Sequence, residues 1–232
     1  CGAVIAAGLV VSIVSALLIV PVVLDRDQYT ATVAMGTTAA GTTPVPADLD
    51  WRAASNDRAA FPNCLGAPPE RCTIVEGSGL NILMIGDSHA RMLVPALEAV
   101  AQRNSASLSV AVLPNCPWQK GLTYPRNVPD CQAHQADWYD RLVPAIDPDL
   151  VVLVHRPMDG PVRGVDVLGP DGIAEVGTPE HARLIIDRAT ETVGGLREDG
   201  RLALIVEPVP MAASDPTACL SDAIYLDECR YV

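Results

Sequence analysis

The sequence predicts an α/β domain built on a parallel sheet, because short apolar runs alternate with amphipathic helical segments. Residues 150–154 (LVVLV) are apolar throughout, which is typical of a strand buried on both faces of a parallel sheet. Thr178 followed by Pro179 is a strong helix start, and Gly200 a strong helix end. This order favours right-handed crossovers that place helices on both faces.

The predicted elements begin at residue 81, where the alternation becomes regular. We expect strands at 81–85, 107–113, 150–154 and 202–206, and helices at 88–103, 132–146 and 179–198. Asp147-Pro148-Asp149 separates the second helix from the strand that follows it, because proline disfavours helix at the residue before it. Ligands of such sheets bind beyond the carboxyl ends of the strands.

The first residues predict a membrane anchor. Residues 2–24 carry no charge, and a helix of this length spans about 35 Å, against about 30 Å of bilayer hydrocarbon. We therefore expect a transmembrane helix at 1–24, a linker at 25–79 that includes the Thr-, Gly- and Pro-rich stretch 37–46, and the α/β domain at 80–232. The run lacks the basic start of a signal peptide, and a lipidated Cys1 remains an alternative.

The cysteines indicate an oxidising compartment. Cys1 aside, they fall into the neighbouring couples Cys64–Cys72, Cys116–Cys131 and Cys219–Cys229, none with the C-x-x-C spacing of a zinc or thioredoxin site. Local couples of this kind predict disulfides, which persist outside the cytoplasm. The alternative is a set of buried thiols in a cytosolic domain. We expect a cell-membrane protein with a single span here and an extracytoplasmic C-terminal domain.

Charge and composition exclude one class of partner. The net charge is −12, and the phosphates of a nucleic acid would repel such a surface. Only 4% of the residues are aromatic, so the core must consist mainly of aliphatic side chains.

The segment Gly86-Asp87-Ser88-His89 carries the candidate chemistry. Gly86 lets the chain turn where the first strand ends, and Ser88 then lies at the start of a helix on the carboxyl edge of the sheet. The N–H groups and positive dipole of a helix start favour an oxyanion, so Ser88 is the candidate nucleophile. The alternative is that Asp87 or Ser88 only caps the helix.

The order of pieces along the chain supports the first interpretation. An apolar helix, a linker, a cysteine couple and then ILMIGDSHA resembles the SGNH (GDSL-type) domain fused to the last helix of bacterial membrane acyltransferases of the acyltransferase 3 family. The turn at 114–117 (PNCP), the segment 147–153 (DPDLVVL) and Cys219-Leu220 resemble the same domain. The resemblance implies a flavodoxin-like three-layer sandwich and a Ser-His-Asp triad with Ser88 as nucleophile.

The resemblance also implies partners and a reaction. The membrane acyltransferase domain in cis would pass an acyl group outward from a donor such as acetyl-CoA. The SGNH domain would transfer that group, expected to be acetyl, to a cell-envelope glycan. It would need no cofactor and no metal of its own.

The sequence departs from the family at several site positions. The family's Asp and His form D-x-x-H near the end of the domain, a pattern that this chain lacks, and we expect the chain to be C-terminally incomplete. Asp87 and His89 are neighbours of the nucleophile, and His155 is the alternative base, although a plain strand-end role is the other interpretation. Asn115 and Arg156 are candidate oxyanion donors. His134 and His181 are expected at the surface.

Three other functions remain open. The same fold could serve a carbohydrate esterase or deacetylase, since water and a sugar hydroxyl can attack the same acyl-enzyme. An α/β-hydrolase is a further candidate because Gly86-x-Ser88-x-Ala90 is close to G-x-S-x-G, but only a linker precedes it. A non-catalytic glycan-binding module is the third, and a D-x-x-H in the full-length gene would argue against it.

Overall fold

The structure, a computed structural model, describes residues 43–46, 50–51, 53, 63–160, 163–207 and 215–229. The chain forms two compact units, one from residues 1–47 and 223–230, the other from residues 48–222 and 231–232. The predicted transmembrane helix lies outside the described residues, as does most of the linker. Among the helices that the structure does describe, none is long and apolar enough to cross a bilayer.

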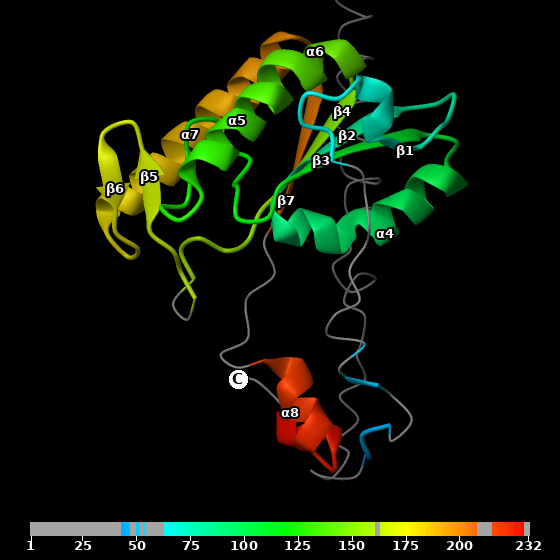
Figure 1. Cartoon of the computed structure of the whole chain (residues 1–232), viewed down its shortest axis with the longest axis vertical. Coiled ribbons are helices and arrows are strands. Elements are labelled where there is room, and N and C mark those ends of the chain that lie inside the picture. Colours follow the sequence, from blue (N-terminus) through cyan, green and yellow to red (C-terminus); the bar gives the residue numbers. More distant parts are fainter. Residues whose placement is uncertain are drawn as a thin grey trace, which may run out of the picture. The chain divides into compact units, whose positions relative to one another are not determined.

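The larger unit is built on one sheet with the strand order β1-β3-β2-β4-β7 (Figure 1). The strands are β1 Thr73–Val75, β2 Asn81–Gly86, β3 Ser107–Val112, β4 Leu150–Val154 and β7 Leu202–Val206. β2 pairs in parallel with β3 and with β4, and β4 pairs in parallel with β7. The strand from Asn81 is therefore central, as predicted, and these four strands end at the same edge of the sheet.

The sheet is parallel, as predicted, except at one edge, where an antiparallel strand was not predicted. β1 pairs antiparallel with β3, and the Thr73 and Ser109 hydroxyls lie 3.0 Å apart across this pair. β1 and the preceding 3-10 helix η1 (Pro69–Cys72) fall within the predicted linker, so the sheet begins before residue 80. A strand of three residues is too short to show an alternation of apolar and polar side chains.

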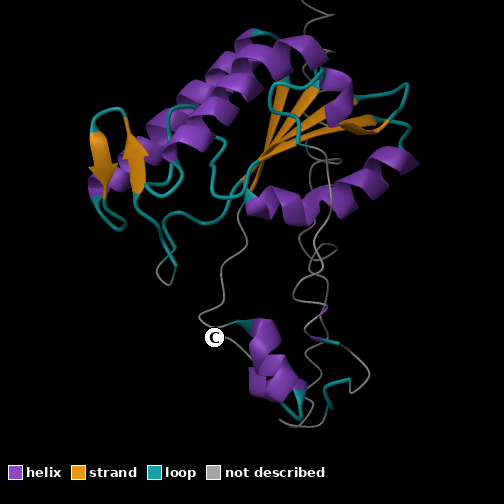
Figure 2. Ribbon diagram, viewed as in Figure 1, coloured by secondary structure: helices purple, strands orange, loops and turns teal. Residues whose placement is uncertain are grey.

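Helices cover both faces of this sheet, which gives three layers (Figure 2). One face carries α4 (Ser88–Arg103). The other carries α7 (Pro179–Glu198) and a continuous run of α5 (Val128–Ala136), the π-helix η2 (Asp137–Leu142) and α6 (Val143–Ile146). The predicted helix 132–146 is therefore longer at its start, where Pro129 lies in the first turn, and it contains a π-helical turn.

Alternate side chains of the central strand supply the two cores. Leu83 and Ile85 are buried with Trp118 and Trp138 on the side of α5 and α7. Met84 on the opposite face is buried with residues of α4, as the period of two along a strand requires. β7 forms the far edge of the sheet, and its Leu202, Leu204 and Ile205 are exposed.

A small hairpin lies between β4 and α7 and was not predicted. It consists of β5 (Val167–Gly169) and β6 (Gly172–Ala174), and a small core of its own joins it to the loop after β3. That core consists of Leu122, Tyr124, Met158, Val167 and Ala174. Backbone hydrogen bonds between Thr123 and Leu168, of 3.0 and 2.8 Å, fasten the hairpin to the same loop.

The described part of the smaller unit is a short pairing of two segments. Pro44 bridges Tyr225, and the Val45 N–H donates to the Ile224 carbonyl at 2.9 Å. A 3-10 helix, η3 (Leu226–Cys229), follows. Part of the predicted Thr- and Pro-rich linker thus has a backbone partner. Helix α8 (Pro216–Asp222) belongs to the larger unit.

The cysteine couples differ from one another. Cys116 and Cys131 form a disulfide with their Cα atoms 5.2 Å apart, and Cys219 and Cys229 are each disulfide-bonded. The predicted Cys64–Cys72 disulfide is not formed. Both residues are buried thiols hydrogen-bonded to each other, and the Cys64 Sγ also donates to the Val110 carbonyl at 3.4 Å. Spacing along the chain cannot distinguish a bonded couple from a packed one.

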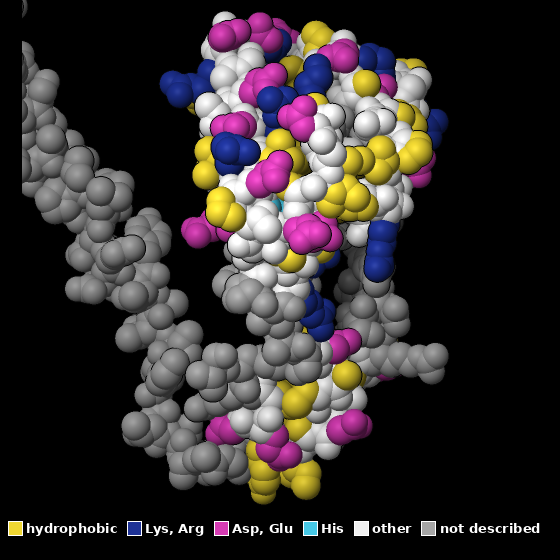
Figure 3. Space-filling model, turned by 90° about the vertical axis from the view of Figure 1, so that its left-hand side faces the viewer, with side chains coloured by type: hydrophobic (Ala, Val, Ile, Leu, Met, Phe, Trp, Pro, Cys, Tyr) yellow, Lys and Arg dark blue, Asp and Glu magenta, His cyan; other side chains and the backbone are white. Residues whose placement is uncertain are grey.

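The surface carries both signs of charge. On the face shown in Figure 3, Asp and Glu side chains are interspersed with Arg and Lys over the folded domain.

Candidate active site

Gly86 ends β2 where the chain passes closest to β4. A Cβ atom at this position would lie 1.9 Å from the Val154 carbonyl oxygen and 2.9 Å from the Ala90 Cβ. Since a backbone oxygen cannot move aside without breaking the sheet, only glycine fits here. Because of this close approach, α4 begins two residues after Gly86, at the carboxyl end of the central strand.

Asp87 is the N-cap of α4. Its Oδ1 accepts the His89 N–H at 2.8 Å, and its carbonyl oxygen accepts the Arg91 N–H at 3.1 Å, which is the first bond of the helix. The capping function therefore belongs to Asp87 alone, and the Ser88 hydroxyl is not needed for it.

Ser88 is the first residue of α4 and is half-buried. A helix provides no acceptor for the N–H groups of its first turn, and the cap accepts only that of His89, which leaves those of Ser88 and Ala90 without a helical partner. Together with the positive end of the helix dipole, they form a setting in which an oxyanion beside Ser88 is stabilised.

The Asp87 carboxylate also contacts two other segments. Its Oδ2 accepts the backbone N–H of Arg156 at 2.9 Å and the hydroxyl of Tyr124 at 3.5 Å. The side chain of Asp87 has 0% exposure. Burial, followed by the Asp87 charge, raises the pKa of Tyr124, so this phenol stays protonated and donates.

His89 lies beside Asp87, with 3.7 Å between its Nδ1 and the Asp87 Oδ1. Burial lowers the pKa of His89, and the Asp87 charge opposes part of that shift. Burial therefore favours the neutral imidazole, and His89 remains a neighbour of the nucleophile rather than its expected base.

His155 directly follows the last residue of β4 and is 9% exposed. Its Nδ1 lies 2.5 Å from the Arg156 carbonyl oxygen, and its ring centre lies 5.8 Å from that of Trp118. Burial lowers the pKa of His155. These contacts hold the ring as a packed residue at the strand end, with one nitrogen engaged by the backbone.

The two candidate oxyanion donors differ. Asn115 is exposed in the turn after β3 with a φ of 60°, a left-handed conformation that asparagine tolerates. The backbone N–H of Arg156 donates to Asp87, and the Nη2 of the Arg156 side chain donates to the Arg163 carbonyl at 2.6 Å. The Arg156 amide is therefore a structural donor rather than an oxyanion donor.

The remaining histidines have backbone partners. The His134 Nδ1 lies 2.8 Å from the Asp130 carbonyl oxygen, and this side chain is half-buried. The prediction that His181 lies at the surface was wrong. Its side chain is buried, and its Nε2 lies 2.9 Å from the Val165 carbonyl oxygen, where it ties α7 to the segment before the hairpin.

Comparison with known protein families identifies the family to which this chain belongs. The model of the SGNH domain that is fused to AT3 domains matches residues 54–231. The chain belongs to this family of SGNH domains. A search of curated proteins finds no match.

One solved structure similar to this SGNH domain is the periplasmic domain of a lipopolysaccharide acetyltransferase from Salmonella ser. Paratyphi A. The two sequences are 18% identical, and the TM-score is 0.45. The match covers 64% of this chain and 52% of that one, so the chain spans about half the length of its neighbour.

Sequence reasoning missed Tyr124 and Trp118, which complete the surroundings of Asp87 and His155 in this SGNH domain. Both lie in the loop between β3 and α5, which has no periodic pattern. The one available signal is Cys116 just before Trp118, since the disulfide holds this loop against α5.

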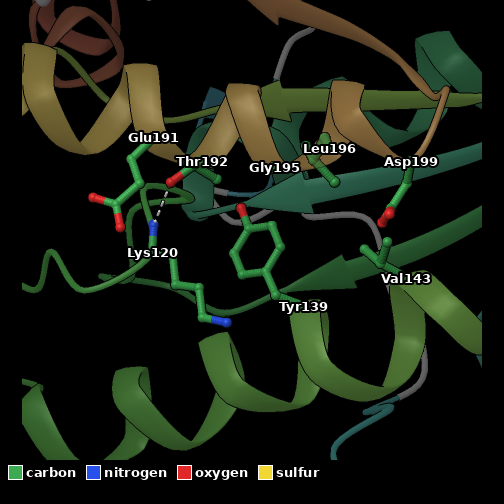
Figure 4. A pocket seen from close by; sticks show the side chains of 8 residues that line it. All are labelled: Lys120, Tyr139, Val143, Glu191, Thr192, Gly195, Leu196 and Asp199. Carbon is green, nitrogen blue, oxygen red and sulfur yellow. Dashed lines mark hydrogen bonds between the residues drawn. The ribbon is translucent and has the colours of Figure 1, made fainter.

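A separate cavity of about 330 Å³ lies between α7 and the π-helix η2 (Figure 4). The Lys120 N–H donates to the Thr192 Oγ1 at 2.9 Å at its edge. None of the predicted site residues lines it. The lining residues are Lys120, Tyr139, Val143, Glu191, Thr192, Gly195, Leu196 and Asp199. Within the described part of the chain, no group of His, Cys, Asp and Glu side chains could hold a metal ion.

Proposed function

We propose that this SGNH domain transfers an O-acyl group, expected to be acetyl, to a cell-envelope glycan through an acyl-enzyme on Ser88. One observation carries the proposal. Asp87 caps α4, so the half-buried Ser88 hydroxyl at the carboxyl edge of the sheet is not required for the cap. Membership of a family fused to AT3 domains supports acyl transfer as the reaction class.

The reaction would proceed in two displacements. The Ser88 Oγ attacks the acyl carbonyl, its proton passes to a base, and the oxyanion faces the N–H groups at the start of α4. The tetrahedral species then expels the donor's leaving group, which takes the proton from the base. A sugar hydroxyl attacks the ester and gives its proton to the freed base. The second tetrahedral species expels the Ser88 Oγ, which takes that proton back, and the O-acylated glycan is released. Attack by water instead would make the domain an esterase.

The base is expected from the D-x-x-H of the family, a pattern that this chain lacks. We propose that it belongs to the full-length protein. The same protein would carry the AT3 domain in cis, which receives the acyl group from a donor such as acetyl-CoA. The span at 1–24 would join that domain to an extracytoplasmic SGNH domain.

Replacement of Ser88 in the full-length protein tests this proposal. Loss of a catalytic nucleophile costs about 10⁶ in rate, so Ser88→Ala should abolish glycan acylation in cells. Loss of a helix cap costs only about 1 kcal/mol, so the matched variant Thr178→Ala, which removes the α7 cap, should keep acylation. Protein levels in the membrane should be the same for both. Wild-type acylation in Ser88→Ala would instead make the domain a glycan-binding module.

A further inference from the structure

The Asp87 carboxylate does more than a helix cap requires. A cap needs one acceptor, and at α7 the Thr178 hydroxyl supplies it at 3.2 Å from the His181 N. At α4 the cap is the fully buried carboxylate of Asp87. Burial of a charge is costly unless hydrogen bonds compensate for it. The additional function must therefore lie in its other contacts.

Those contacts join three segments that are distant in sequence. Asp87 Oδ1 accepts from His89 at the start of α4, and Oδ2 accepts from Arg156 after β4 and from Tyr124 in the loop after β3. β3 and β4 pair with opposite edges of β2. The Asp87 carboxylate therefore bridges the loop that follows β3 and the loop that follows β4. Ser88 follows Asp87 directly.

All three partners of Asp87 are donors, and this fact explains why the residue is charged. A carboxylate offers acceptor lone pairs on both oxygens, whereas an asparagine offers them on one oxygen and places an NH₂ at the other. With asparagine, the NH₂ would face either the His89 N–H or the Arg156 N–H. Asp87→Asn therefore breaks the bridge while the shape of the side chain stays the same.

We infer that Asp87 is a positioning residue: its carboxylate locks the helix start that carries Ser88 to the loops after β3 and β4, and the acylation step depends on this lock. The inference rests on the proposed function of Ser88. Displacement of a reacting group by about 1 Å can cost about 10²-fold in rate. Loosening of the bridge should therefore slow acylation without changing how tightly the acyl donor binds.

A fluorophosphonate probe tests this inference in membranes that contain the full-length protein. The Ser88 Oγ forms a bond to phosphorus, the P–F bond breaks, and fluoride leaves while the hydroxyl proton passes to the base. The rate at saturating probe and the half-saturating concentration are measured separately. Asp87→Asn should lower the saturated rate at least ~10-fold, with the half-saturating concentration within about twofold of wild type. Thr178→Ala should change neither, although it also loses a cap.

Tyr124→Phe keeps the inference testable if Asp87→Asn does not fold. It removes one donor to Oδ2 and keeps the ring, so it should lower the saturated rate by a smaller factor and have no further effect in combination with Asp87→Asn. An independent readout is the NMR titration of His89. Because the Asp87 charge raises the pKa of His89, Asp87→Asn should lower that pKa further, and Thr178→Ala should not.

The outcomes separate the two proposals. Absence of Ser88 labelling in the wild type would overturn the proposed function. Efficient labelling in the wild type and equally fast labelling in Asp87→Asn or Tyr124→Phe would overturn the positioning inference alone. Equal rate losses in Asp87→Asn and Thr178→Ala would show that Asp87 acts only as a helix cap, which would also overturn the positioning inference.

Discussion

Gly86 and Asp87 set the geometry around Ser88 by opposite means. Gly86 removes a side chain so that β2 and β4 approach closely, and Asp87 adds a buried acceptor that joins the segments around that contact. The sequence predicted a turn at Gly86, and the contact with the Val154 carbonyl oxygen was not predicted. The bridge to Arg156 and Tyr124 was not predicted either, because a local sequence cannot show which distant N–H or O–H groups meet a carboxylate.

We predict that Gly86→Ala destabilises the domain strongly. The added methyl would lie 1.9 Å from the Val154 carbonyl oxygen, and overpacking of this kind costs about 3 kcal/mol or more. The matched control is Gly194→Ala inside α7, where no atom lies within 4 Å of an added Cβ. It should stabilise by up to about 1 kcal/mol, because alanine favours helix over glycine. Urea denaturation measures both, and equal stabilities of the two variants would contradict the close contact.

The elements show where a pattern suffices and where it fails. The strand 150–154 and the helix 179–198 were predicted with the bounds that the structure has, because each combines a clear periodicity or apolar run with strong end signals. β1, β5 and β6 are strands of three residues each, too short for a pattern, and pairing with β3 or with each other stabilises them. The predicted disulfide at Cys64–Cys72 failed for a related reason, since neighbouring positions do not fix the geometry of two side chains.

The disulfide between Cys116 and Cys131 should contribute substantially to stability, because it closes the loop that carries Trp118 and Tyr124 against α5. A disulfide that joins residues 15 positions apart stabilises the folded state by about 3 kcal/mol, because it reduces the conformational entropy of the unfolded chain. Joint replacement of both cysteines by alanine should lower the free energy of unfolding by about that amount. The same replacement at Cys64 and Cys72, also buried but not cross-linked, should cost less. Equal losses in the two double variants, measured by thermal or urea unfolding, would show that packing rather than the cross-link matters.

For the whole molecule, the two histidines near Asp87 predict how stability depends on pH. Burial lowers the pKa of both His89 and His155, so the unfolded chain binds more protons than the folded one below about pH 6.5. The free energy of unfolding should therefore fall as the pH drops from 7 to 5. Their contribution is fully present at neutral pH and is lost as the solution becomes more acidic than the unfolded-state pKa.

Melting temperatures across this pH range measure the effect. His155→Gln should make the dependence shallower, since a glutamine at this position does not titrate, and His89→Gln should do so as well. An unchanged slope in both variants would mean that other groups cause the loss of stability in acid.

The bridge at Asp87 and the hairpin have a joint consequence for how such a domain can diversify. The chain after β4 is fixed at its base, where the Arg156 amide meets Asp87, and again where Leu168 pairs with Thr123. The hairpin is therefore fastened to the loop after β3 through its first strand, and only its turn between β5 and β6 projects beyond these contacts. A change of length at this turn should leave the start of α4 and Ser88 in place, so the outer part of the hairpin can vary independently of the site.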